Sequence, residues 1–444
     1  MSNDLDIARK HFELGSKKFE EKLYSQAEQE FSSSLNFLPN RVSTLSKLIL
    51  CKIQLKKFQE CEELLSKIQK IDKDYVYGKF CKALYLGEIL EFEKSKEELM
   101  TINIQNEPLE FQSTFYNCLA TTLYYLDEYE NSVSNYLKSI ELNPNNYSAN
   151  VNLGTVYLSK NNFKDGWKYY EHRLKKNNLD HKKYPSNIKE IEGKKILIRH
   201  EQGIGDTIQF SRLITELKKY NCEIDFLIPQ SLNNLFSIDG VNIINKIISN
   251  DKYQYEINLM SLPFLLNLDL KKPSLINTIN SDLLVNKKNI KDKNLKIGIA
   301  WSGNQSYQFD IMRSIKLESL KNIIDLQNQK SIKFYCLQKN IRDNDLDFFK
   351  KSNLINLGNL NFYDLAKEIN NLDLVISSCT SILHLSSSLK MKTFGLLANK
   401  ADWRWLDDSK KSNWYETLEI FKLKKNQNWE DLSKTVVENI LKLI

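Results

Sequence analysis

The stretch FELGSKKFEEKLYSQAEQEFSSSLNFLPN, residues 12–40, decides how the first part of the chain is built. A similar pattern, with a leucine-glycine pair in its first part, returns at residues 147–174 as YSANVNLGTVYLSKNNFKDGWKYYEHRL. A further copy, YNCLATTLYYLDEYENSVSNYLKSIELNPNN, occupies residues 116–146 and ends in Pro144, which corresponds to Pro39 of the first copy. The two prolines lie 144 − 39 = 105 residues apart, close to three periods of about 35. A period of this length predicts helix pairs stacked side by side.

This unit resembles the tetratricopeptide repeat, in which small residues let two paired helices touch and a proline follows the second helix. We expect roughly five helix pairs over residues 6–176, with weaker copies at 48–72 and 80–100. Amphipathic helices that form no repeat would leave a similar apolar pattern. A stack of such pairs would offer an extended concave surface for a peptide or protein partner.

The composition of the chain argues against several classes of protein, among them nucleic-acid-binding, secreted and membrane-spanning proteins. The 63 basic and 56 acidic residues give a net charge of +7, spread along 444 residues, so nucleic-acid binding is not indicated. The sequence starts without a secretory signal and has no apolar run long enough to span a bilayer, so we expect a cytoplasmic protein without a transmembrane segment. Its seven scattered cysteines lack CxxC spacing and predict reduced thiols rather than disulfides or a metal site.

The second half of the sequence has a different pattern. Residues 177–194 are polar and lysine-rich and predict a linker. Beyond them, short apolar runs alternate with helical patterns, which predicts parallel sheets with crossover helices. The expected strands are 195–199, 223–228, 296–301, 333–337, 372–377 and 391–397.

A second lysine-rich break, at 286–296, divides this half into two parts. We therefore expect an α + α/β chain, with a helical solenoid followed by two Rossmann-like domains that face one another across a cleft. The predicted intervals are 1–176 for the repeats, 177–194 for the linker, 195–287 for the first Rossmann-like domain and 288–444 for the second.

The sequence HEQGIGDTIQF directly follows the first predicted strand. Gly203 and Gly205 would let the chain turn sharply, and Asp206 would stand at the start of a helix, at the carboxyl end of a strand where α/β proteins bind ligands. The aspartate could be a catalytic acid or could only cap the helix. The motif lacks the third glycine of a dinucleotide fingerprint, which argues against an NAD enzyme.

A second candidate turn ends strand 296–301. Ser302, Gly303 and Asn304 are small or polar and would allow a ligand to approach closely, and Arg313 could neutralise a diphosphate. A plain turn with an arginine on the surface would give the same sequence.

The stretch LDLVISSCTSILHLSSSLKMKTFGLL carries a third candidate. Thr380 and Ser381 would begin a helix whose free N–H groups can hold an anion, and His384 lies one turn further on. A histidine on an apolar helix can equally belong to the core. The aromatic segment at 402–415 could stack on a base or sugar, although such residues more often pack a crossover onto the sheet.

Taken in order, these motifs resemble tetratricopeptide-repeat glycosyltransferases related to the ADP-heptose heptosyltransferases. The resemblance includes Leu337-Gln338-Lys339, the DWRW sequence at 402–405 and the segment DGWKYYEHRL at 165–174, so it extends over nearly the whole chain. It implies a GT-B arrangement, with the donor held mainly by the C-terminal domain, the acceptor held by the N-terminal one, and no metal required.

The resemblance also implies roles for particular residues. Asp206 matches the proposed base, and Thr380, Ser381 and His384 match the diphosphate loop. The residues expected to bind substrate or donor further include Gly203, Gly205, Ser302, Gly303, Asn304, Arg313, Gln338 and Lys339. This chain has Cys379 where heptosyltransferases often carry aspartate, and a serine in place of a loop glycine, so the sugar and nucleotide stay open.

The resulting hypothesis is an inverting, metal-independent glycosyltransferase without a cofactor. Its donor substrate would be a nucleotide-diphosphate sugar, and its acceptor, a protein, peptide or glycan, would be recruited by the repeats. The alternative is a non-catalytic repeat scaffold whose second half is a degenerate nucleotide-binding GT-B fold.

Overall fold

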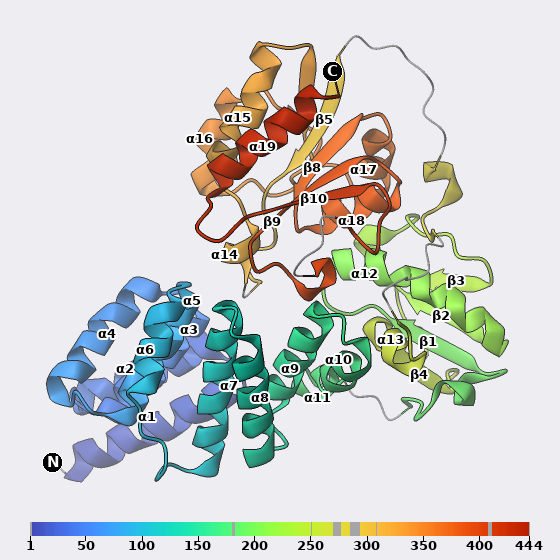
Figure 1. The fold of residues 1–444 in the computed structure, drawn as a ribbon. Helices are drawn as coiled ribbons and strands as arrows, with labels where there is room; N and C mark the ends of the chain where they lie inside the picture. The colour runs from blue at the N-terminus through green and yellow to red at the C-terminus, as the bar shows by residue number, and fades with distance from the viewer. Residues whose placement is uncertain are drawn as a thin grey trace. The chain divides into compact units, whose positions relative to one another are not determined.

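The computed structural model describes residues 2–179, 183–249, 251–269, 277–284, 294–307, 309–406 and 411–443. Its contacts divide the chain into two compact units, Met1–Leu153 and Gly154–Ile444. The first unit is helical, and the second contains two parallel sheets with helices (Figure 1). Most of the lysine-rich break predicted at 286–296 lies outside the described residues, and the four predicted domain intervals stay predictions.

Antiparallel helix pairs make up the first unit. Their bounds are α1 Ser2–Glu20, α2 Tyr24–Phe37, α3 Val42–Gln54, α4 Phe58–Ile71, α5 Val76–Glu88, α6 Phe92–Met100, α7 Leu109–Tyr125 and α8 Tyr129–Leu142, and α9 Tyr147–Ser159 continues into the second unit. With α10 Phe163–Tyr170, the second helices of the pairs begin 34, 34, 37 and 34 residues apart. The predicted period is therefore present as five successive helix pairs.

A small residue holds the fourth position of every second helix. These residues are Ala27, Cys61, Ser95, Ser132 and Gly166. The two serines donate hydrogen bonds of 2.8 and 2.7 Å to backbone carbonyls of the partner helix, and a Cβ atom at Gly166 would come within 2.8 Å of Leu158. Close contact between the paired helices is thus the physical reason for the repeating small residue.

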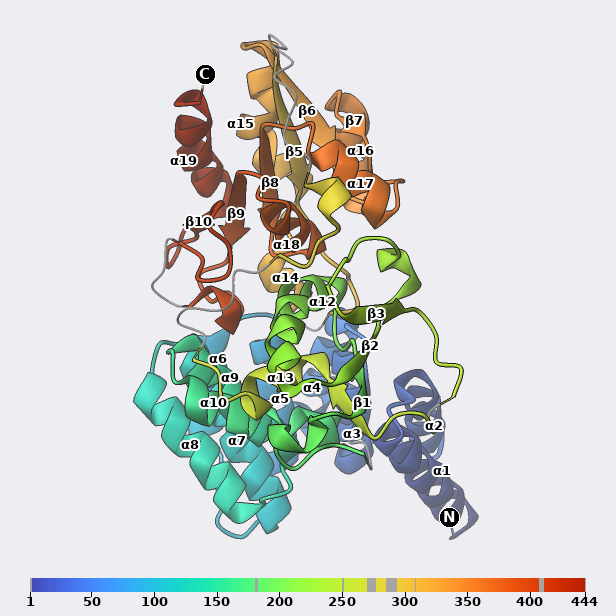
Figure 2. The same cartoon turned by 90° about the vertical axis from the view of Figure 1, so that its right-hand side faces the viewer.

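The second unit begins with the end of the repeats and leads into a four-stranded parallel sheet. After α10 come α11 Arg173–Lys176, η1 Ile188–Ile191, β1 Lys195–Arg199, α12 Ile204–Phe210, η2 Ser211–Tyr220, β2 Glu223–Leu227, η3 Gln230–Leu232, β3 Val241–Ile244, β4 Tyr255–Asn258, η4 Leu259–Ser261, α13 Leu262–Leu265 and η5 Ser281–Leu283. The strand order is β3-β2-β1-β4, and β1, β2 and β3 run side by side in Figure 2. The order reverses between β1 and β4, at the strand that leads into the glycine-rich loop.

A six-stranded parallel sheet follows. Its elements are β5 Leu295–Ala300, α14 Asp310–Arg313, η6 Leu317–Leu320, α15 Lys321–Ile324, η7 Asp325–Asn328, β6 Ile332–Cys336, α16 Asp343–Lys351, β7 Ile355–Asn356, α17 Phe362–Ile369, β8 Leu374–Ser378, α18 Ser381–Ser388, β9 Thr393–Leu397, η8 Trp403–Trp405, β10 Leu418–Lys422 and α19 Trp429–Leu441. The order β10-β9-β8-β5-β6-β7 is that of a doubly wound α/β fold.

Helices cover both faces of this sheet. One core joins apolar residues of its strands to α15, α16 and α19, whereas α17 and α18 lie on the other side (Figure 1). The crossovers change face between β5 and β8, where the strand order reverses. Ligands of such sheets bind at the carboxyl ends of the strands beside this point, which directs attention to the residues that follow β5 and β8.

Candidate functional site

The glycine-rich loop after β1 forms the first part of the site. Gly203 is the N-cap of α12, with φ −90° and ψ 168°, and Asp206 is the third residue of the helix. The Asp206 carboxylate accepts a hydrogen bond of 2.8 Å from the backbone N–H of Gly203. Gly203 is therefore the N-cap residue, and Asp206, in the first turn, accepts the hydrogen bond of the Gly203 N–H that would otherwise have no partner in the helix.

Asp206 also makes an ion pair with Arg404 of η8. The guanidinium of Arg404 bonds to Asp402 as well, at 2.6 Å, and the arginine is 7% exposed. Burial raises the pKa of the Asp206 carboxyl above its ordinary value, and the positive charge of Arg404 opposes that shift. The carboxylate thus has one partner on each oxygen, and each oxygen keeps a lone-pair site for a further donor.

His384 lies directly against the glycine-rich loop. A Cβ atom at Gly205 would lie only 2.7 Å from Cδ2 of the histidine, so a glycine is needed where α12 meets α18 (Figure 1 and Figure 2). The ring stacks on Trp405, and Nδ1 lies 2.9 Å from the Tyr415 hydroxyl. Burial, reinforced by nearby Arg404 and other arginines, lowers the pKa of His384 to about 3. The imidazole is therefore neutral and joins two of the candidate motifs.

Two buried hydroxyls lie where the six-stranded sheet changes winding direction. Ala300 of β5 pairs with Ser377 of β8, and Ser302 and Ser378 follow within two residues. Among the described residues neither Ser302 nor Ser378 has a hydrogen-bond partner for its hydroxyl, although both are at most 3% exposed. Buried polar groups are normally paired, so these hydroxyls are suited to a ligand or an ordered water at this point.

Arg313 closes over the turn after β5. A Cβ atom at Gly303 would lie 2.5 Å from its guanidinium, so the glycine lets the arginine lie close to the backbone of the turn. The arginine donates at 3.5 Å to the carbonyls of Asn304 and Cys379, and it lies 3.4 Å from Asp310. These long contacts leave the charge of Arg313 weakly compensated beside the start of α18.

Gln338 shapes the same turn from within the protein. Its amide oxygen accepts the N–H groups of Trp301 and Ser302, at 3.2 and 3.1 Å, and its amide nitrogen donates to the Ser302 carbonyl at 2.8 Å. The neighbouring Lys339 is exposed. Of the predicted Gln338-Lys339 pair, only the glutamine contacts the turn in the structure.

The structure adds three arginines that were not among the predicted site residues. Arg342 donates to the Gly303 carbonyl at 3.0 Å and pairs with Asp310, and Arg404 pairs with Asp206. Arg212 is 6% exposed and donates to the Trp414 carbonyl at 2.7 Å. The sequence signal for Arg404 was its place in DWRW, whereas nothing in the local pattern marked the other two.

Apart from the exposed Lys339, the predicted residues fall into two sets, and Trp405 joins them by donating its indole N–H to the Cys379 sulfur at 3.1 Å. Contacts join Gly203, Gly205, Asp206, Arg404, Trp405 and His384, and a second set joins Gly303, Asn304, Arg313 and Cys379, which directly precedes Thr380 and Ser381. Among the described residues, no group of His, Cys, Asp or Glu side chains has the arrangement of a metal site.

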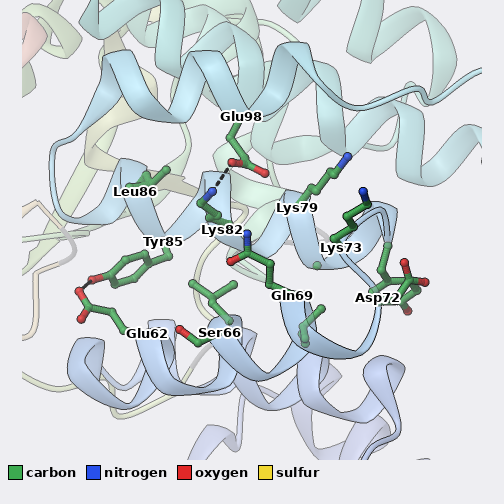
Figure 3. Close-up of a pocket in the computed structure, with 14 residues that line it drawn as sticks. Glu62, Ser66, Gln69, Asp72, Lys73, Lys79, Lys82, Tyr85, Leu86 and Glu98 are labelled. Carbon is green, nitrogen blue, oxygen red and sulfur yellow. Dashed lines mark hydrogen bonds and ion pairs between the residues drawn. The ribbon is translucent and has the colours of Figure 1, made fainter.

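The repeats contain a separate cavity of about 320 Å³, lined by residues of α4, α5 and α6 (Figure 3). The ammonium group of Lys82 lies 2.5 Å from Glu98 at one edge, and the Tyr85 hydroxyl bonds to Glu62 at another. Leu65 and Leu86 supply apolar surface. Most of the other lining residues are polar or charged, so the cavity can receive a polar or charged side chain of another molecule.

Comparison with known proteins identifies the repeats. The Tetratricopeptide repeat family matches residues 135–168. Similar solved structures include PilF of Pseudomonas aeruginosa (13% identity, 49% of this chain and 89% of that chain, TM-score 0.35) and TTC0263, a thermophilic TPR protein of Thermus thermophilus (14%, 39% and 93%, TM-score 0.35). MamA from Desulfovibrio magneticus RS-1 is similar over 39% of this chain and 95% of that chain, with 16% identity and a TM-score of 0.29. No curated protein matches the sequence.

At these identities and TM-scores, the solved structures support no statement about function. In the described part of the chain, no helix combines the length and apolar character needed to cross a membrane. Residues 135–168 are a tetratricopeptide repeat within a series of helix pairs, an architecture that indicates a protein-interaction surface.

Proposed function

We propose that the chain is a glycosyltransferase that takes its sugar from a nucleotide diphosphate, in a GT-B arrangement related to the heptosyltransferases, and that its repeats recruit the acceptor. One observation carries the proposal: the loops that follow β1, β5 and β8 meet, with Gly205 against His384 and Arg313 bonded to the carbonyl of Cys379. Loops at the carboxyl ends of parallel strands are where α/β folds bind nucleotides.

The side of the site formed by β5 and β8 suits a diphosphate leaving group. The unpartnered hydroxyls of Ser302 and Ser378, the weakly compensated charge of Arg313 and the free N–H groups at the start of α18 all favour an anion. His384 is neutral and packed between Gly205, Trp405 and Tyr415, so its role there is to hold the loops together.

Asp206 would act on the acceptor. The acceptor hydroxyl attacks the anomeric carbon, its proton passes to the Asp206 carboxylate, and the bond from that carbon to the diphosphate oxygen breaks with its electron pair left on the diphosphate. The raised pKa of Asp206 makes it a stronger base than an ordinary aspartate. Arg404 and the Gly203 N–H hold the carboxylate in place while leaving lone pairs for the incoming proton.

Calorimetric titration with UDP, GDP, ADP and their sugar conjugates tests the donor side. Ser381→Asp should weaken nucleotide binding roughly tenfold or more, because it places a negative charge beside the diphosphate. The same substitution should leave the melting temperature unchanged or slightly higher, since aspartate suits the first turn of a helix.

Ser331→Asp is the matched control, because Ser331 is exposed and precedes β6 at the opposite, amino end of the same sheet. It should leave nucleotide affinity unchanged. Wild-type protein that binds none of these nucleotides would overturn the proposal and leave the non-catalytic scaffold. Equal weakening by both variants would remove the anion site from the start of α18.

A further inference from the structure

The last helix of the repeats contacts both elements that carry the Asp206–Arg404 ion pair. Trp167 of α10 is 2% exposed, and its ring lies edge-on to Phe210 at 6.2 Å and to Trp403 at 5.2 Å. Phe210 is the last residue of α12, four positions after Asp206, and Trp403 directly precedes Arg404. One side chain of α10 therefore packs against the elements that carry both members of the ion pair.

A buried arginine extends this contact to the strand end before the loop. Arg173 is 1% exposed and donates to both carboxylate oxygens of Glu201, at 3.1 and 2.8 Å. It also donates to the Ser261 hydroxyl at 2.8 Å, and Glu201 accepts the N–H of Met260 at 2.8 Å. Arg173 also pairs with Glu171, whereas Arg173 is the cation that pairs with the buried Glu201 here, so moving the two apart would leave the Glu201 carboxylate without its charged partner.

The next residue along the chain is held in an unfavourable backbone conformation. Gln202 has φ 58°, which side-chain-bearing residues adopt at a cost. Its amide donates a hydrogen bond of 2.8 Å to the Tyr170 hydroxyl of α10. Gly203 then donates its N–H to Asp206, so the conformation that Tyr170 supports leads directly into the loop that carries the aspartate.

We propose that Tyr170, at the end of α10, and Arg173, at the start of α11, are positioning residues for the loop 201–206. Arg173 fixes the entry to the loop through Glu201, and Tyr170 holds Gln202 in its left-handed conformation. The end of the fifth helix pair and the short helix α11 that follows it thus support the site, and the repeats do more than recruit a partner. That Tyr170 and Arg173 hold the loop in place does not depend on the proposed function. An effect of these residues on turnover does rest on the proposed glycosyltransferase activity.

Hydrogen exchange of the full chain tests the structural part. Removing one partner of the Arg173–Glu201 pair would endanger folding, so the informative change is Tyr170→Phe, which keeps the ring against Trp403 and removes only the hydroxyl. Amide exchange in the peptide 200–207 should become roughly fivefold faster, as expected for the loss of one hydrogen bond, with little change in melting temperature. The matched control is Tyr169→Phe, since Tyr169 packs on Tyr157 instead.

The outcomes separate cleanly. Faster exchange in Tyr170→Phe alone supports the inference, whereas no change, or the same change in Tyr169→Phe, overturns it. If the protein transfers sugar, Tyr170→Phe should also lower kcat while the KM for the donor stays constant. A wild-type protein without transfer activity would contradict the proposed function. The hydrogen-exchange rates of the two variants would still decide whether Tyr170 positions the loop.

Discussion

At the scale of single residues, His384 gives the site a pH-dependent stability. Its pKa in the folded protein, about 3, lies below the ordinary value of 6.5. A group that is harder to protonate when folded contributes full stability above pH 6.5, and that contribution is lost as the pH falls from 6.5 toward 3. Each pKa unit of such a difference corresponds to about 1.4 kcal/mol.

His384→Gln should therefore lower the melting temperature more at about pH 7.5 than at about pH 5, because at the lower pH the wild-type protein has already lost part of the benefit of a neutral histidine. Thermal melting of both proteins at the two pH values measures this. If the difference in melting temperature between variant and wild type stays constant with pH, the environment of His384 does not oppose its protonation.

The residues of the site differ in how far the sequence could predict them. Gly203, Gly205 and Asp206 stand in a local strand-turn-helix pattern, so their place at the carboxyl end of a strand could be predicted. Arg404 could not be connected to Asp206 in this way, because 198 residues separate the two partners. Whether any of these residues binds a donor stays a prediction.

At the scale of elements, the contact between α12 and α18 depends on one glycine. Gly205→Ala would place a Cβ atom 2.7 Å from the His384 ring, so the two helices would have to separate. Overpacking of this kind costs about 1–3 kcal/mol, and we expect a lower melting temperature together with weaker nucleotide binding.

Gly203→Ala provides the control for this change. The nearest atom to a Cβ at Gly203 is Oδ2 of Asp206 at 3.1 Å, and the backbone there has an ordinary negative φ. This variant should therefore be destabilised much less. Equal losses of melting temperature in the two variants would contradict the tight contact at Gly205.

The strands show what an apolar pattern can predict. The six predicted strands correspond to β1, β2, β5, β6, β8 and β9, which are interior strands of their sheets. The four strands that the sequence analysis missed in the described part of the chain, β3, β4, β7 and β10, are the edges. Interior strands of parallel sheets are covered on both faces, which favours longer apolar segments. Three of the four edge strands, β3, β4 and β7, have four residues or fewer, which is too short for a clear apolar run.

At the scale of the whole molecule, the repeat pattern and the contacts divide the chain at different places. The period continues through α10, which places the end of the repeats near residue 176, but contacts group everything from Gly154 with the sheets. Trp167 and Arg173 explain the difference, because their partners Phe210, Trp403 and Glu201 belong to the second half of the sequence. The period of the sequence predicts how the helices pair, but it does not predict which elements the last pair packs against.

The central proposal is that the loops after β1, β5 and β8 form one sugar-transfer site in which Asp206 is the base. Asp206→Asn keeps the shape of the side chain and an acceptor for the Gly203 N–H, but it removes the proton acceptor and the negative charge that faces Arg404. Asp402→Asn is the matched control, because it also removes a carboxylate from Arg404, at 2.6 Å, while leaving the base in place.

The deciding measurement is the rate at which each variant releases nucleoside diphosphate from the sugar nucleotide that binds most tightly in the calorimetric screen. Asp206→Asn should be slower than wild type by about 10²–10⁴-fold with donor affinity little changed, and Asp402→Asn should stay close to wild type. An Asp206→Asn protein that keeps nearly full activity, or two variants that lose activity equally and in step with their melting temperatures, would contradict the account and leave Asp206 a structural ion-pair partner of Arg404.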